Sequence, residues 1–484
     1  MKQQEAYLVL DIGTGNARAA IVSPPGTVLG VARADIRYYR DGLYPESIYF
    51  KPGELWNQLR ILTGEALEQA GPVTLIAATT TSQREGIVLI DKSGKAIMGL
   101  PNIDHRGREW EDQDGDKSRI YSLSGRYPTS LFSAFKLVGI RERRTDSWNS
   151  LSFFLSISDW AAWELCGVAR YEHSQASETL LYDVAAGDWH SGLCDLFGIP
   201  QQLLPALSQS GTVLGPVKQS IAASWALHPA LQVVTGGGDT QMAIKSTQPA
   251  VGDVVIVSGT TTPVVKLEGA YITDKEERTW TSRDIMPGRF VFEANAGVTG
   301  LNYQRLKEIF YPNEGYDVIE RELMQNGNKP CIAALGSLVA GDKKPVTRGG
   351  FVFPAPVAHE LSRSSFVWAT LLDIAFSIAE NYKVLAEIAG HDAGYIWACG
   401  GGLQSASLRN LIAAVTGNDV CVRRGFQQAT AVGAAMLCNE ALQKAVDKQE
   451  TDIEHSPVDR EQADNYQALY RQWKETRENF RAIS

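Results

Sequence analysis

Residues 7–22 read YLVLDIGTGNARAAIV, and this stretch decides the fold. The apolar run at 7–10 ends at Asp11, and a second run at 17–22 follows the glycine-rich segment DIGTG. Apolar, β-branched runs separated by glycines are typical of two strands joined by a tight turn. The sequence PPG at 24–26 is a further turn signal. We therefore expect three consecutive strands, with the glycine-rich turn between the first two.

A similar unit occurs about half a chain later, where residues 254–267 read VVIVSGTTTPVVKL. The segment SGTTT separates two β-branched runs, in the place that DIGTG takes in the first unit. Similar segments at a large spacing are the signature of an internal duplication. We expect each half of the chain to be a copy of one architecture.

Glycine triplets follow two further apolar runs. The run at 231–234 precedes GGG at 236–238, and the run at 395–398 precedes GGG at 400–402. Helical spacing follows the second triplet and recurs elsewhere, at 55–70, 158–166, 369–389, 408–415 and in the tail around Trp473. Strands that alternate with helices predict an α/β fold with a parallel or mixed sheet. Gly417 is placed to end the helix after the second triplet, and the tail helix is expected to pack on the body.

Length and composition narrow the class of protein. A chain of 484 residues exceeds the size of one hydrophobic core, so two or three domains are expected. The net charge of -9 disfavours nucleic acid or an anionic membrane as a partner. The six cysteines form no Cys-x-x-Cys pair, and no apolar run is long enough to span a bilayer. We expect a soluble, cytoplasmic protein with reduced thiols.

Both glycine-threonine turns suit phosphate binding. Glycines let backbone N–H groups approach an anion, and Thr14 adds a hydroxyl donor. Asp11 stands where a carboxylate can hold Mg²⁺ beside phosphate oxygens. Plain hairpins, with Asp11 as a cap and threonines for their strand propensity, remain the alternative. Arg18 stands where the dinucleotide-binding fingerprint needs its third glycine, and no P-loop motif occurs.

Asp239 follows the first glycine triplet, at the expected carboxyl end of a strand. Open α/β sheets bind ligands at such ends, and a carboxylate there can take a proton from a hydroxyl that attacks phosphorus. Helix capping is the alternative role. The second triplet would pass its backbone under adenine or ribose and open a helix whose N-terminus faces negative charge, or it forms a packing turn.

Adjacent Arg84 and Glu85 offer donors beside an acceptor, which suits recognition of neighbouring hydroxyls on a polyol. Asp104 and Arg106 add a second carboxylate and cation after another short strand. A surface ion pair on a strand is the alternative for Arg84 and Glu85.

Taken together, the motifs resemble the FGGY family of carbohydrate kinases over about residues 7–440. In chain order they are DIGTG with Arg18, QRE at 83–85, Asp104 with Arg106, GGGD at 236–239, SGTT at 258–261, GGG at 400–402 and AVGAA at 431–435. Within the family, residues 82–89, 157–160 and 238–241 are most similar to autoinducer-2 kinases, and the layout is similar to that of xylulokinases. Residues 83–85 are also similar to glycerol kinases.

The resemblance implies an α/β protein with two actin-like (ribonuclease H-like) domains and an interdomain catalytic cleft. Residues 1–245 would bind the sugar and carry the base, and residues 246–484 would bind the nucleotide. The expected site residues are Asp239 as catalytic base; Gln83, Arg84, Glu85, Asp104, Asp239 and Thr240 for the substrate; Thr14, Gly15, Arg18, Gly259, Thr260, Thr261, Gly400, Gly401, Gly402 and Ser405 for ATP; and Asp11 and Asp239 for Mg²⁺.

The expected reaction is transfer of the γ-phosphoryl group of ATP to a hydroxyl of a small sugar or polyol, with a xylulose-like ketose first and the autoinducer-2 precursor as alternative. A non-catalytic, actin-like protein that closes on a nucleotide is the rival from another class, and a homodimer stays open. Three residues depart from the family pattern on the nucleotide side, namely Leu403, Leu408 and Gln428.

Overall fold

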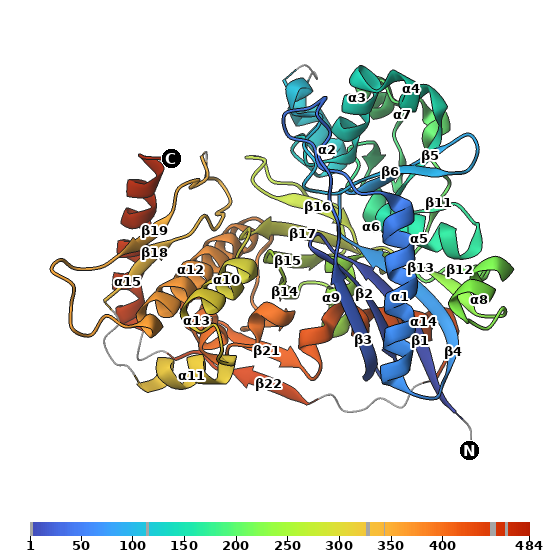
Figure 1. Cartoon of the computed structure of the whole chain (residues 1–484). Helices are drawn as coiled ribbons and strands as arrows, with labels where there is room; N and C mark the ends of the chain where they lie inside the picture. The colour runs from blue at the N-terminus through green and yellow to red at the C-terminus, as the bar shows by residue number, and fades with distance from the viewer. Residues whose placement is uncertain (1–2, 113–115, 326–329, 343, 446–451, 460–462) are drawn as a thin grey trace.

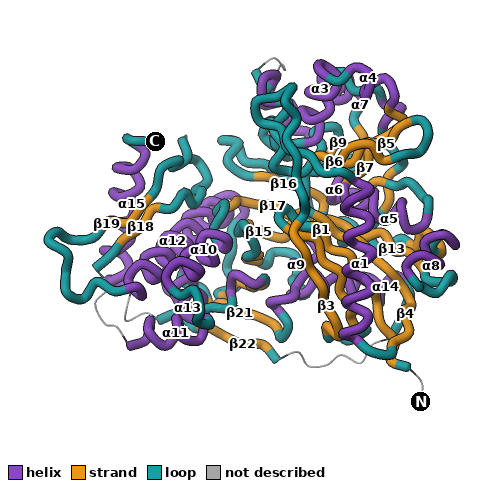
Figure 2. Tube along the Cα trace, in the orientation of Figure 1, coloured by secondary structure: helices purple, strands orange, loops and turns teal. Residues whose placement is uncertain are grey.

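The computed structural model describes residues 3–112, 116–325, 330–342, 344–445, 452–459 and 463–484. Figures 1 and 2 show two α/β halves side by side, the first coloured blue to green and the second yellow to red in Figure 1. Each half has a large hydrophobic cluster of its own, built around Leu8 and Val88 in the first and around Ile256 and Ile396 in the second. The expected α/β architecture in two halves is confirmed.

The first sheet has the strand order β12-β13-β4-β1-β2-β3. β1 pairs antiparallel with β2 and parallel with β4, which in turn pairs parallel with β13. The strands are β1 (Gln4–Ile12), β2 (Asn16–Val22), β3 (Val28–Asp35), β4 (Val73–Ser82), β12 (Val213–Pro216) and β13 (Gln232–Gly238).

The second sheet repeats this pattern in the order β16-β17-β15-β14-β20-β21-β22. β14 pairs antiparallel with β15 and parallel with β20, which pairs parallel with β21. The series β17-β15-β14-β20-β21 therefore matches β3-β2-β1-β4-β13, and the expected duplication is confirmed. The strands are β14 (Val254–Val257), β15 (Pro263–Glu268), β16 (Trp280–Arg283), β17 (Phe290–Asn295), β20 (Tyr395–Cys399), β21 (Asp419–Arg423) and β22 (Ile453–Ser456).

Helices form where the apolar spacing predicts them. These are α1 (Pro52–Ala70), α5 (Ile157–Cys166), α12 (Arg363–Ala389), α13 (Ala406–Thr416) and α15 (Ala463–Arg481). Gly417 ends α13 with a left-handed φ of 70°. In the tail helix, Trp473 is buried and its indole N–H donates to Asp373 at 2.8 Å, so the tail packs on the second half.

Two helices join the halves, α9 (Asp239–Thr247) and α14 (Ala429–Ala441). They touch at Gly433, where a Cβ atom would stand 1.9 Å from the carbonyl oxygen of Met242. Only glycine permits this approach. Met242 and Ala434 also belong to a small apolar cluster against β1. This contact fixes the start of α9 beside the cleft between the sheets.

The first glycine triplet lies inside β13 and does not form the turn after it. A Cβ atom on Gly236 would stand 1.7 Å from the carbonyl oxygen of Thr80 on β4, so the missing side chain lets the two strands approach. The strand therefore runs to Gly238, and Asp239 stands at its carboxyl end, as expected.

None of the helices in the described part of the chain has the length and apolar character needed to span a membrane. Smaller elements complete both halves. In the first half they are β5 (Ile87–Asp91), β6 (Ala96–Leu100), α2 (Lys117–Ser124), α3 (Ser133–Arg143), α4 (Thr145–Ser150), β7 (Leu151–Ser156), β8 (Tyr171–Glu172), α6 (His173–Ala176), β9 (Tyr182–Asp183), β10 (Asp188–Trp189), α7 (Ser191–Phe197), β11 (Leu207–Ser208) and α8 (Gln219–Trp225). In the second they are α10 (Gly300–Phe310), α11 (Tyr316–Gln325), β18 (Ile332–Ala334) and β19 (Gly350–Val352).

Candidate active site

Asp239 stands at the point where β13 ends and α9 begins, and it is partly exposed. Its Oδ1 accepts hydrogen bonds from the backbone N–H of Thr240 at 2.6 Å and from the Thr240 hydroxyl at 3.3 Å. Burial raises the pKa of Asp239 to about 6, the charge of Asp11 acts in the same direction, and the positive charge of Arg84 opposes both. Asp239 is therefore a stronger base than an ordinary aspartate and is still ionised at neutral pH.

The first hairpin brings Asp11 opposite Arg18, and the two side chains form an ion pair. The charge of Asp11 raises the pKa of Arg18, to which Asp239 also contributes. The Thr14 hydroxyl donates to Asn102 at 3.1 Å, so it is available to phosphate only after an exchange of partners. Gly15 faces open space, since no heavy atom lies within 4 Å of the position of an added Cβ.

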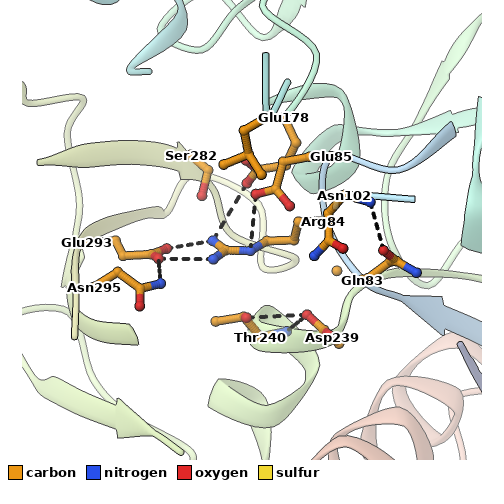
Figure 3. Close-up of polar contacts among 12 residues, drawn as sticks. Gln83, Arg84, Glu85, Asn102, Glu178, Asp239, Thr240, Ser282, Glu293 and Asn295 are labelled. Carbon is orange, nitrogen blue, oxygen red and sulfur yellow. Dashed lines mark hydrogen bonds and ion pairs between the residues drawn. The ribbon is translucent and has the colours of Figure 1, made fainter. Parts of the chain in front are cut away.

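Arg84 and Glu85 follow β4 directly and are buried, so the alternative of a surface ion pair is wrong. Arg84 makes a bidentate ion pair with Glu293 on β17, with Nη1 to Oε2 at 2.5 Å and Nη2 to Oε1 at 2.9 Å. β17 belongs to the second sheet, so this ion pair joins the two halves of the molecule (Figure 3). Glu85 has a positive φ of 63°, an unusual conformation for a non-glycine residue, which aims its side chain into the same group.

Glu85 has a pKa raised to about 8, mainly by burial. The negative charge of Glu178 also raises it, whereas Arg84, Arg126 and Lys136 lower it. Burial therefore favours the uncharged form of Glu85, in which the carboxyl group can donate a hydrogen bond.

Two expected substrate residues have their polar atoms engaged elsewhere. Gln83 donates to the carbonyl oxygen of Gly13 at 3.0 Å and accepts from the backbone N–H of Asn102 at 2.9 Å, so it braces the first hairpin. Asp104 is completely buried, and its two oxygens accept from Arg106 at 2.7 Å and from the N–H of Ile48 at 2.9 Å. The structure does not bring Asp104 into the group around Arg84.

The second hairpin packs against the second glycine triplet. Gly400 has a φ of 101°, and an added Cβ would stand 2.2 Å from the carbonyl oxygen of Ser258. That same oxygen accepts from the N–H of Gly402 at 2.9 Å. Gly259, Thr260 and Thr261 at the tip are exposed, as is Gly401. The second hairpin, with threonines at its tip, and the second glycine triplet therefore pack against each other at Ser258.

The triplet does not open a helix, contrary to the expectation. Gly401–Leu403 form a single 3₁₀ turn, and α13 begins only at Ala406. Ser405 caps α13 by accepting from the N–H of Leu408 at 3.1 Å, and it is buried. The departures at Leu403 and Leu408 are both buried in the second core, so these side chains serve packing.

Several residues that complete the site carry no signal in the sequence. Glu178 and Arg126 form a buried ion pair beside Arg84 and Glu85, and Gln241 donates to Ser282 on β16 at 3.2 Å. Arg126, Glu178 and Glu293 lie on three distant segments and fall in no motif. Only the folded chain brings them together.

The carboxylates fit a magnesium ion that arrives with a nucleotide. Asp11 and Asp239 are close enough for the charge of one to raise the pKa of the other. Mg²⁺ with a nucleotide needs only one or two carboxylates, because phosphate and water supply its other ligands. Among the described residues, no cluster of three or more His, Cys, Asp or Glu side chains forms a metal site made by protein alone.

Comparison with known proteins identifies the family. Residues 6–245 match the N-terminal domain, and residues 336–442 the C-terminal domain, of the FGGY family of carbohydrate kinases. The Bacillus subtilis protein YoaC, which is named as a sugar kinase, is 45% identical over 99% of this chain and 98% of its own. The autoinducer-2 kinase of Salmonella paratyphi B is 26% identical over 98% of this chain and 94% of its own.

The fold is that of solved kinases. The xylulose kinase of Lactobacillus acidophilus superposes with a TM-score of 0.83 over 99% of both chains, at 15% sequence identity. The resemblance stated from the motifs, and the actin-like two-domain fold that it implies, are thus confirmed. The chain belongs to the FGGY family of carbohydrate kinases and is a phosphotransferase that uses an alcohol group as acceptor.

Proposed function

We propose that this kinase transfers the γ-phosphoryl group of ATP to a hydroxyl of a small sugar or polyol, a xylulose-like ketose first, with Asp239 as the base. The observation that carries the proposal is the place of Asp239. A carboxylate with a raised pKa stands at the carboxyl end of β13, near enough to Asp11 and Arg84 for the charges of both to act on it. Such a group accepts a proton well near neutral pH.

The acceptor would lie against Arg84, Glu85 and Thr240. A hydroxyl held there is within reach of Asp239, which takes its proton as the oxygen attacks the γ-phosphorus in line. Burial raises the pKa of Glu85 and favours its protonated form, which would donate a hydrogen bond to a sugar oxygen. Gln83 and Asp104 would act on the acceptor indirectly, Gln83 by bracing the first hairpin and Asp104 by holding Arg106 and the backbone of Ile48.

The nucleotide would lie across both hairpins. Thr14, Gly15 and Arg18 would contact phosphates from the first half, and Gly259, Thr260 and Thr261 from the second. The adenosine would lie along Gly400, Gly401 and Gly402, which Ser405 holds in place as the cap of α13. Mg²⁺, when bound at Asp11 and Asp239, supplies charge neutralisation on the phosphate oxygens.

Closure of the cleft would exclude water, which competes with the sugar hydroxyl as an acceptor. The ion pair between Arg84 and Glu293 joins the two halves directly above the base. We place the division between the sugar-binding and nucleotide-binding domains after residue 245, where α9 nears its end.

The test is a phosphorylation screen with purified protein, ATP and Mg²⁺. The panel holds pentuloses, hexuloses, polyols, gluconate and the autoinducer-2 precursor, with ADP release and product mass as readouts. We expect ADP release that depends on an acceptor and a product heavier by one phosphoryl group. ADP release that no acceptor stimulates would overturn the proposal and favour a nucleotide-dependent binding protein.

A further inference from the structure

Asn102, which follows β6, contacts the segments proposed to bind both substrates, and it is only partly buried. Its Oδ1 accepts from the hydroxyl of Thr14 at 3.1 Å, on the hairpin proposed to bind phosphate. Its backbone N–H donates to Oε1 of Gln83 at 2.9 Å, and Gln83 directly precedes Arg84. One residue therefore joins the nucleotide hairpin to the segment that would bind the acceptor.

The backbone of Asn102 is held on two sides, so its side chain is the part that can change partners. The backbone carbonyl oxygen accepts from Nζ of Lys136 at 3.4 Å, a buried side chain near Glu85. Gln83, which accepts from the backbone N–H, also donates to the carbonyl oxygen of Gly13 at 3.0 Å. These contacts keep Asn102 beside the first hairpin whichever partner its amide has.

The amide of Asn102 is accessible to a further partner. Its Nδ2 group donates to no other atom within the described ranges of the chain, and part of the residue is exposed to solvent. Figure 3 shows Asn102 among the residues around Arg84, next to Gln83. Cγ of Arg84 lies 3.4 Å from the position of a Cβ on Gly238, so Arg84 packs against the end of β13. An acceptor that lies against Arg84 and Asp239 would therefore border this amide.

The Thr14 hydroxyl has to choose between Asn102 and a phosphate. A hydroxyl carries a single O–H donor, so Thr14 can donate to Oδ1 of Asn102 or to a phosphate oxygen, but not to both. A hydrogen bond to a charged phosphate is the stronger of the two. Binding of the nucleotide would therefore release Oδ1 of Asn102 to another donor.

We propose that Asn102 couples the nucleotide site to the acceptor site by this exchange of partners. When Thr14 turns to a nucleotide phosphate, Oδ1 of Asn102 accepts from a hydroxyl of the acceptor. The inference rests on the proposed kinase function and deepens it. It makes the two substrates bind more tightly together than alone, and each strengthens the binding of the other by the same factor.

The first test removes the hydroxyl that occupies Asn102. Isothermal titration measures the affinity for xylulose, or for the acceptor that the screen shows to be better, in the absence of nucleotide. Thr14→Val has no hydroxyl to hold Oδ1, so it should bind the acceptor about 2- to 10-fold more tightly than the parent, the size of one hydrogen bond. Equal or weaker binding by Thr14→Val would overturn the inference.

A matched control replaces a threonine that makes the same kind of bond elsewhere. The hydroxyl of Thr74, at the opposite end of β4 from Arg84, donates to the amide oxygen of Gln3 at 3.2 Å. Thr74→Val should bind the acceptor as the parent does. A gain of affinity in Thr74→Val equal to that in Thr14→Val would show that the effect does not pass through Asn102, and the inference would fail.

The second test removes the accepting group and repeats the titration with Mg²⁺ and adenylyl imidodiphosphate, an ATP analogue that resists hydrolysis. With the analogue, Asn102→Ala should bind the acceptor about 2- to 10-fold more weakly than the parent. Without it, the two should agree, because Oδ1 of the parent is engaged by Thr14. An equal loss in both conditions, or no loss in either, would overturn the inference.

The two variants change opposite ends of one hydrogen bond, so either decides the question if the other does not fold. The outcome is also separate from that of the phosphorylation screen. If the parent phosphorylates no acceptor of the panel, the proposed function fails. If it phosphorylates an acceptor and Thr14→Val binds that acceptor no more tightly than the parent, only the coupling through Asn102 fails.

Discussion

The two sheets have the same strand order, but the ends of their central strands differ in chemistry. In the first sheet, β4 and β13 lead into Arg84, Glu85 and Asp239, whose ionisable groups are largely removed from water. In the second, β20 leads into Gly400–Gly402, with no side chains at all. Under the proposed function, the first copy of the fold would supply the base and the groups that bind the acceptor hydroxyls, and the second would offer backbone that a nucleotide can approach. The two halves share one arrangement of strands, and they differ in the residues that follow the central strands.

This difference has a thermodynamic side. Glu85 and Asp239 both have raised pKa values because burial disfavours their charged forms. Residues with strongly shifted pKa values cluster where chemistry is done, at a cost in stability. In the second half, the constraint is one of shape: Gly400 has a positive φ, and its backbone lies too close to Ser258 for a side chain.

The largest expected effect comes from replacing Asp239, at the end of β13. Asp239→Asn keeps the shape of the side chain but cannot accept the proton, so kcat/KM for the acceptor should fall about 10²–10⁴-fold. Steady-state kinetics with the best acceptor measures it. Retention of more than about a tenth of the parent rate would mean that another group is the base.

Arg84→Ala tests the charged end as a structural link between the halves. It leaves Glu293 buried, with Asn295 as its remaining side-chain partner at 3.0 Å, and should lower the free energy of unfolding by about 3–5 kcal/mol. Urea unfolding provides the measurement. Arg321→Ala, which removes an exposed ion pair with Asp317 on α11, is the control and should cost less than about 1 kcal/mol. Equal losses would contradict the bridging role.

Gly400→Ala tests the glycine end in the same way. The new methyl group would meet the Ser258 carbonyl at 2.2 Å and force a strained φ, which should destabilise the protein by about 1–3 kcal/mol and displace the second hairpin. Thermal unfolding measures the loss. Gly390→Ala, also at positive φ but with nothing within 4 Å of the added Cβ, should cost less. A smaller loss for Gly400→Ala than for this control would show that the contact with Ser258 is not tight.

The smallest expected effect is the gradual change of kcat/KM for the acceptor with pH. Because the base must be ionised, kcat/KM for the acceptor should fall about tenfold per pH unit below the pKa of Asp239, which is about 6, and be level just above it. A pH–rate profile in buffers of constant ionic strength checks this. An acid limb that begins only below about 4, the ordinary carboxyl range, would show that Asp239 is not held in the environment described.

Local sequence signals were enough to predict the parts of the site that lie in continuous motifs. Both hairpins, both glycine triplets and the position of Asp239 between a strand and a helix follow from turn chemistry and apolar spacing, which are local properties. The positions of three further residues depend on how distant segments meet in the folded chain, which no short-range pattern indicates. These residues are Glu293, which pairs with Arg84, and the ion pair of Arg126 and Glu178.

Packing also decided two features that residue type alone does not show. The missing side chains of the first triplet allow close approach of β13 to β4, and the strand continues through the triplet to Gly238. Asp104 is expected to bind the substrate, and in the structure its oxygens accept hydrogen bonds from Arg106 and from the backbone N–H of Ile48. Residue type indicated the chemistry in both cases, and packing decided its use.

The central claim is that the residues after β13 act on the acceptor and that the glycine triplet after β20 binds the nucleotide. Its most direct test is to measure the affinity for ADP, which lacks the transferred group, in Asp239→Asn and in Gly400→Ala. Isothermal titration should show that Gly400→Ala binds ADP at least about tenfold more weakly than the parent, whereas Asp239→Asn stays within about threefold. A Gly400→Ala protein that binds ADP as tightly as the parent, or an Asp239→Asn protein that loses as much affinity, would contradict the account.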